Sequence, residues 1–229
     1  MNKFLALYLD GPMQSWGYMS KFDRRTTLGF PTKSGIAGMI CAAMGIEKAD
    51  TAKLAEIANL NMMVYVLSDR ERKTEIRRIT DFHTVGGGFD EKKSAYENQS
   101  IVRNAKGKPG NTVVTRREYL LDAKFAVILS GEDALLEKMD TALRNPKWGV
   151  WLGRKSCIPV APVAQGCHES QEKSLAAVKE AYKKMHGKEC EFRKTISDVA
   201  SFAEGSDSYM DFPLDFGKRE FSVRRISAE

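Results

Sequence analysis

A basic segment in the middle of the chain carries the residues best suited to bind a polyanion. Between Lys92 and Arg117 the sequence holds seven lysines and arginines and one carboxylate, Glu97, so its net charge of +6 equals that of all 229 residues. The segment is polar, contains glycine and proline, and has no apolar period that would bury it. Such a local excess of cations predicts an exposed arm that binds nucleic acid, with a solvated surface loop as the alternative. The candidate contacts here are Arg103, Lys106, Lys108, Arg116 and Arg117.

An amide, a hydroxyl and an indole occupy three consecutive positions just after the first predicted strand. Gln14, Ser15 and Trp16 follow a Gly-Pro turn. These groups can hydrogen-bond base edges or stack on a base, so we expect them to contact nucleotides. A buried tryptophan whose neighbours merely form a turn is the competing interpretation.

Candidate phosphate contacts occur at two other places. Lys33 and Ser34 stand at the start of a predicted helix, where free backbone N–H groups and the helix dipole favour an anion. The Gly-x4-Gly-Lys order of a nucleotide-hydrolysing loop is missing, and an ordinary capped helix is the alternative. Arg154 and Lys155 follow two tryptophans that we expect to pack in the core, which leaves both cations available for phosphate.

The sequence predicts no metal, no other cofactor and no membrane contact. Two histidines and three of the four cysteines could be drawn as a zinc site, but their spacings match no tight-loop template; they are Cys157, Cys167, His168, His186 and Cys190. The longest apolar stretches fall far short of the ~20 residues that a membrane span needs. The amino-terminal residues run directly into a strand pattern, so we expect an unprocessed cytoplasmic protein.

The predicted elements that must position these residues form an α+β fold. Residues 4–9 are apolar on both faces, which indicates a buried central strand. A helix over 36–44, a helical piece over 51–58 and a strand over 62–67 follow, and then a strand at 124–129, a helix over 132–143 and a strand at 149–152. This order is the split β-α-β plan of ferredoxin-like and RNA-recognition folds.

Two further features complete the predicted organisation. Strand-like runs at 75–85 and 112–120 bracket the basic segment, which predicts a long β-hairpin. A change in composition after about residue 156, followed by a helix over 172–185 and a basic strand over 219–225, predicts a smaller C-terminal lobe. We therefore expect residues 1–156 to form the main domain and 157–229 to form that lobe.

Five motifs, in order, resemble those of the CasD family, the fifth CRISPR-associated protein family, in its type I-E form. They are GPMQSWG, FPTKSGIAGMICAAMGI, VTRREYLLDAKFAV, PKWGVWLGRKSCIP, and DFPLDF with REFSVRRI, and the match spans residues 3 to 225. The resemblance implies a non-catalytic RNA-binding subunit of a Cascade surveillance complex, with a RAMP domain and a thumb hairpin at about 81–118. It also implies a grip on the 5′ handle of the CRISPR RNA, contact with the backbone and large subunits, and target DNA nearby.

A catalytic role is the main alternative. The resemblance extends to the type I-C branch, where the same fold cuts precursor CRISPR RNA without metal and uses a tyrosine, a lysine and a histidine. His83 lies outside the C-terminal part and has no lysine beside it in sequence, whereas such cleavage needs several groups in register. A generic RNA-recognition protein is a third class, but the RNP aromatic segment is missing.

Overall fold

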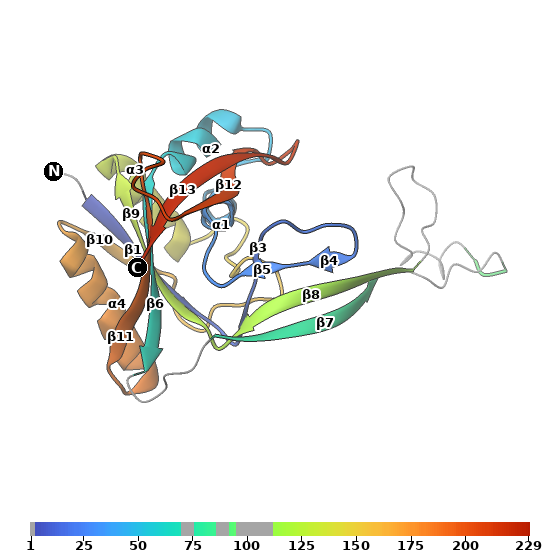
Figure 1. The fold of residues 1–229 in the computed structure, drawn as a ribbon, viewed down its shortest axis with the longest axis horizontal. Helices are drawn as coiled ribbons and strands as arrows, with labels where there is room; N and C mark the ends of the chain where they lie inside the picture. The colour runs from blue at the N-terminus through green and yellow to red at the C-terminus, as the bar shows by residue number, and fades with distance from the viewer. Residues whose placement is uncertain (1–2, 70–75, 86–91, 95–111) are drawn as a thin grey trace.

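A seven-stranded antiparallel sheet lies at the centre of the molecule, in the order β10-β1-β9-β6-β11-β13-β12 (Figure 1). The computed structural model describes residues 3–69, 76–85, 92–94 and 112–229. The sheet consists of β1 (Lys3–Asp10), β6 (Asn61–Asp69), β9 (Lys124–Gly131), β10 (Ala164–His168), β11 (Cys190–Asp198), β12 (Asp207–Asp215) and β13 (Glu220–Ala228).

Helices cover both faces of this sheet. On one side Leu5, Leu7 and Leu9 of β1 join a core with α1 (Lys33–Met44), α2 (Thr51–Ala58) and α3 (Asp133–Arg144). On the other side Ala6 and Tyr8 pack with Val178 and Tyr182 of α4 (Gln171–His186). The prediction of a central strand that is buried on both faces is confirmed.

Two β-α-β units interleave in the sheet. β1 and β6 are joined through α1 and α2, and β9 lies between them; β9 and β10 are joined through α3, and β1 lies between them. The predicted α+β class is confirmed. The strand predicted at 149–152 is wrong, because Gly149 (φ 100°) and Gly153 (φ 92°) turn the chain there and β10 takes its place in the sheet.

The predicted C-terminal lobe does not form a sheet of its own. β11 pairs with β6 and with β13, so the last strands extend the same central sheet. Ile196 and Ile226 belong to the same core as Leu5. The division between 1–156 and 157–229 is therefore wrong as a structural boundary, and the change in composition marks a long loop that precedes β10.

A two-stranded ribbon projects away from the central sheet (Figure 1). It consists of β7 (Arg77–Val85) and β8 (Val113–Leu121), paired from Arg77↔Leu121 to Val85↔Val113. The short strands β2 (Met13–Gln14) and β4 (Arg24–Arg25) add to β8, and β3 (Trp16–Gly17) pairs with β5 (Thr27–Leu28) beside them. The two strands predicted around the basic segment are thus observed, whereas Arg103, Lys106 and Lys108 lie outside the described residues.

Candidate nucleic-acid interface

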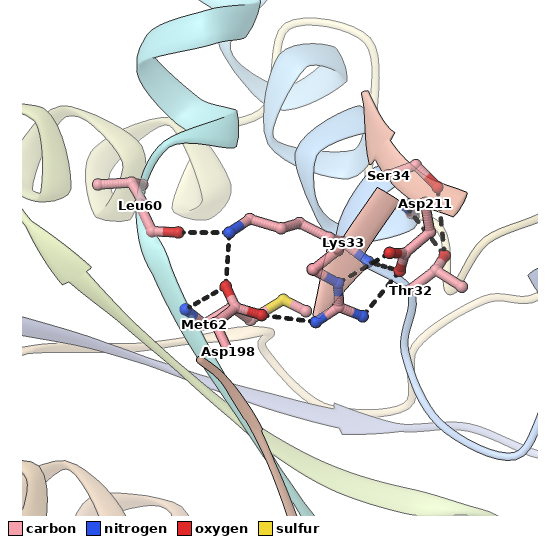
Figure 2. A network of polar contacts seen from close by, with 9 residues as sticks. Thr32, Lys33, Ser34, Leu60, Met62, Asp198 and Asp211 are labelled. Atoms are coloured by element: carbon pink, nitrogen blue, oxygen red, sulfur yellow. Dashed lines mark hydrogen bonds and ion pairs between the residues drawn. The ribbon is translucent and has the colours of Figure 1, made fainter. Parts of the chain in front are cut away.

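The predicted phosphate contact Lys33 is buried in an ion-pair network (Figure 2). Its Nζ lies 2.5 Å from Asp198 Oδ2 and donates to the carbonyl oxygen of Leu60 at 2.8 Å. The guanidinium of Arg224 bridges Asp198 and Asp211, with N–O distances of 2.7 and 2.8 Å. Burial opposes the charge of Arg224, but hydrogen bonds and charges from both carboxylates outweigh it and raise its pKa.

The start of α1 already holds an anion from the protein itself. The backbone N–H of Lys33 donates to Asp211 Oδ2 at 2.8 Å, and Thr32 caps the helix by accepting from the N–H of Gly35 at 3.1 Å. Ser34 lies beside this cap, with its Oγ 3.5 Å from the hydroxyl of Thr32. A carboxylate therefore occupies the place predicted for phosphate, and the prediction of a phosphate contact by Lys33 and Ser34 is wrong for this structure.

The side chains of Gln14, Ser15 and Trp16 also face inward. Gln14 and Trp16 are 0% exposed and Ser15 is 2% exposed. The amide of Gln14 donates to the carbonyl oxygens of Leu9 and Ala123, and it accepts from the indole N–H of Trp16 at 3.1 Å. These groups have no surface to offer a nucleotide, so the predicted direct contacts are contradicted. Their polar atoms instead fix the loop after β1, as the competing interpretation proposed.

Ser15 connects this buried loop to a half-buried cation, Arg154. Its hydroxyl donates to the carbonyl oxygen of Glu118 at 3.0 Å and accepts from Arg154 Nε at 2.8 Å. The Arg154 guanidinium also donates to the carbonyl oxygen of Arg25 at 3.2 Å and lies 5.4 Å from the ring centre of Tyr119. A cation held by three neighbours in one orientation loses little entropy when an anion binds.

Arg154, Lys155 and Arg117 line one groove between the base of the ribbon and the body. The groove has a volume of about 760 Å³, and its lining also includes Met13, Ile79, Asp81, His83, Tyr119 and Ser156. Among the described residues, none of the three cations has a carboxylate oxygen within 4.0 Å of its side-chain nitrogens. Burial lowers the pKa of Arg154, and the charges of Arg117 and Arg25 act in the same direction. Two half-buried arginines and one exposed lysine, none of them in a described ion pair, make this groove a good anion site.

Arg116 points to the opposite face of the ribbon from Arg117, its neighbour in sequence. It forms an ion pair with Asp23, and its guanidinium lies 4.9 Å from the ring centre of Phe82. Both side chains of that stacked pair are exposed. The two predicted arginine contacts are therefore separated by the alternation of the strand, and only Arg117 lines the groove.

Sequence reasoning missed Asp81, Tyr119 and Ile79 as members of the groove. Asp81 and Arg117 are paired positions of β7 and β8, and so are Ile79 and Tyr119. Period-two alternation from His83 back to Ile79 was a signal that could have found the β7 members. Nothing local in the sequence could have joined them to Arg154 and Lys155.

The described part of the chain offers neither a metal site nor a membrane-spanning helix. Within the ranges that the structure describes, no group of three or more histidine, cysteine or acidic side chains is placed to hold a metal ion. Cys157, Cys167 and Cys190 are free thiols, and His186 bonds to Asp10 at 2.7 Å. None of the described helices is long and apolar enough to cross a membrane.

Comparison with known proteins gives one family. The model of the CRISPR-associated protein family Cas_Cas5 matches residues 4–227. The chain is 27% identical over 230 residues to the CRISPR system Cascade subunit CasD of Escherichia coli (strain K12), covering 97% of this chain and 96% of that protein.

Two solved structures are also similar. A chain of a CRISPR RNA-guided surveillance complex is 29% identical, with a TM-score of 0.73, and the match covers 99% of this chain and 89% of that one. A crystal structure of a Cas protein is 28% identical, with a TM-score of 0.63, and the match covers 99% and 93% of the two chains.

Proposed function

The chain belongs to the CRISPR-associated protein family Cas_Cas5, and from this membership we propose that it is a non-catalytic, cytoplasmic RNA-binding subunit of a type I-E Cascade surveillance complex. Its role is to grip the 5′ handle of the CRISPR RNA and to cap the foot of the backbone filament. The similarity to CasD and to a chain of a surveillance complex supports the assembly part of the proposal. The groove supports the RNA part.

The observation that carries the RNA proposal is the set of unpaired cations at the base of the ribbon. Arg117, Arg154 and Lys155 line one groove, and no carboxylate of the described residues forms an ion pair with them within 4.0 Å. Phosphate contacts dominate nucleic-acid affinity, and guanidinium groups bind phosphate with two parallel hydrogen bonds. We assign these three residues to the handle backbone, with Tyr119 supporting Arg154 from below.

The fold also favours the groove as the RNA site, because a helix covers the sheet face that RNA-recognition domains use. The interleaved β-α-β units fit a ferredoxin-like RNA-recognition (RAMP) domain. Isolated RNA-recognition domains stack bases on the open sheet face. Here α4 packs on that face through Val178 and Tyr182, which are 0% and 3% exposed. RNA is therefore directed to the ribbon and the groove beside it.

The ribbon and its basic tip supply the assembly contacts in this proposal. We expect the segment with Arg103, Lys106 and Lys108 to reach across the RNA toward the backbone subunit, with the large subunit and target DNA nearby. The positive charge of this segment favours contact with RNA.

The test of the RNA proposal is handle affinity as a function of salt. Lys155→Ala removes one phosphate contact, so the log–log salt slope should fall by roughly 0.7, and all handle sequences should weaken alike. Lys138→Ala is the matched control, because Lys138 is an exposed lysine on α3 outside the groove. If the log–log salt slope is unchanged in Arg117→Ala, Arg154→Ala and Lys155→Ala, the groove does not bind the RNA backbone.

A metal-independent endoribonuclease is a second candidate, because one observation favours it. His83, Tyr119 and Lys155 line the same groove, although the sequence separates them. Tyr119 is 5% exposed and lies beneath Arg154, which is a poor position for a group that must reach a ribose hydroxyl. We expect repeat RNA to stay intact with the purified protein; specific cleavage that vanishes in both His83→Ala and Lys155→Ala would establish the enzyme.

A further inference from the structure

The groove contains one feature that phosphate binding does not explain, the carboxylate of Asp81. The other acidic side chains of the ribbon are neutralised: Asp23 pairs with Arg116, Glu118 lies 3.8 Å from Arg78, and Asp122 pairs with Arg77. In the part of the ribbon that the structure describes, Asp81 alone accepts no hydrogen bond and has no cation within 4.0 Å.

Among the described residues, Asp81 has no ion-pair partner even though a cation lies opposite it in the ribbon. Asp81 lies directly across from Arg117 in the β7–β8 register, and opposite charges at such positions ordinarily pair. Arg117 instead donates from Nε to the hydroxyl of Thr115 at 3.0 Å. Asp81 is exposed and lines the groove with Arg117, Arg154 and Lys155. Its two carboxylate oxygens are therefore open acceptors inside a site that otherwise donates.

An open carboxylate selects against phosphate and for N–H groups. Its charge repels a phosphate placed directly beside it, so the RNA must present another kind of group at this point of the groove. Carboxylates only accept hydrogen bonds, and the unpaired bases of single-stranded RNA present their Watson–Crick edges for recognition. Among the four bases, guanine presents two adjacent donors on that edge, N1–H and the N2 amino group, which match two carboxylate oxygens.

From this chemistry we infer that Asp81 is a specificity-determining residue that reads the Watson–Crick edge of one unpaired guanine. The cations hold the flanking phosphates and Asp81 selects the base between them. This inference rests on the proposed RNA groove and adds base identity to it.

The probe is an oligouridine RNA with one guanosine at its central position. The comparison RNA carries inosine there, which lacks the N2 amino group. Binding of each to the full-length protein is measured by fluorescence anisotropy. The unmodified protein should prefer guanosine by about tenfold, within the range of a lost bidentate contact. Asp81→Asn should abolish the preference while it leaves or raises affinity for the inosine RNA, because one repulsive charge is gone.

Two controls separate the inference from the function on which it rests. Asp122→Asn removes a paired carboxylate outside the groove, at a position with φ 53° that asparagine tolerates, and it should keep the full guanosine preference. Arg154→Ala should weaken both RNAs alike. If both RNAs bind the unmodified protein equally, or Asp81→Asn keeps the preference, Asp81 reads no guanine. If Arg154→Ala changes neither affinity, the RNA groove itself is wrong.

Discussion

At the scale of single residues, the surroundings of a cation decide whether it binds a ligand or stabilises the fold. Lys33 and Lys155 carry the same group, yet Lys33 is 7% exposed between Asp198 and Leu60, and Lys155 is exposed beside the ring of Trp151. Truncating Lys33 removes one of the cations that Asp198 contacts and the donor to the carbonyl oxygen of Leu60. The free energy cost of losing Lys33 is therefore a cost in folding.

We predict that Lys33→Ala lowers the free energy of unfolding by about 1–3 kcal/mol, because the carbonyl oxygen of Leu60 loses its donor. The buried carboxylate of Asp198 would keep Arg224 but lose its second cation. Denaturant unfolding measures the effect, with Lys155→Ala as the matched exposed lysine that should change stability little. If Lys33→Ala keeps full stability but its RNA affinity depends less on salt concentration, Lys33 contacts RNA and this prediction is wrong.

The thiol of Cys167 offers a pH test of its local environment. Burial raises its pKa to about 11, and the carboxylates of Asp140 and Glu137 act in the same direction. Because the thiolate is the reactive form, the rate of alkylation should rise about tenfold per pH unit from about pH 8 to pH 10. An ordinary thiol with a pKa of about 8.5 would approach its maximum rate over that range.

Iodoacetamide labelling followed by mass spectrometry measures this rate for each cysteine. The chain unfolded in denaturant is the reference, and its Cys167 should follow the ordinary profile. A native profile that levels off below about pH 9 would mean that the thiol is not shielded as described.

At the scale of elements, the ribbon is held at its base independently of its tip. β8 pairs with β7 along nine positions and also with β2 and β4. Tyr119 and Leu120 of β8 are buried in the main core. The base therefore belongs to the folded body.

Replacement of residues 95–112 with a short Gly/Ser linker should leave the melting temperature nearly unchanged and prevent assembly with the other subunits. The first expectation follows from the pairing of the base, and the second from the charge of the removed segment. Co-purification of the subunits with CRISPR RNA measures assembly. Full complexes at normal yield would show that the tip has no part in it.

Local patterns predicted the elements well and the burial of their polar residues poorly. The continuous apolar run of residues 4–9 predicted β1, and the helix predicted over 36–44 is observed as α1 with its start at Lys33, because these signals lie within a few residues. Lys33 was misread because its partners Asp198 and Asp211 lie 165 and 178 positions away. The strand predicted at 149–152 failed because two glycines with positive φ override its apolar composition.

At the scale of the whole molecule, the proposed RNA site lies at the margin of the sheet and not on its face. Helices cover both faces of the sheet, and the ribbon leaves the body at its margin (Figure 1). In our proposal, RNA binds the groove beside the ribbon. This arrangement leaves Arg154 and Arg117 at a junction of elements that are distant in sequence. Base recognition and phosphate binding in our proposals both depend on that junction and on no single element.

The internal position of β1, between β10 and β9, makes its pairing depend on strands far along the chain. Asp10 pairs with Lys124 on one side, and Phe4 pairs with His168 on the other. Both pairings close very long loops, and proteins dominated by such non-local contacts fold in about milliseconds to seconds. Of the strands in this sheet, β1 is synthesised first, and its apolar residues stay unpaired until β9 has been made. An apolar strand without its pairing partners is prone to aggregation until they are made.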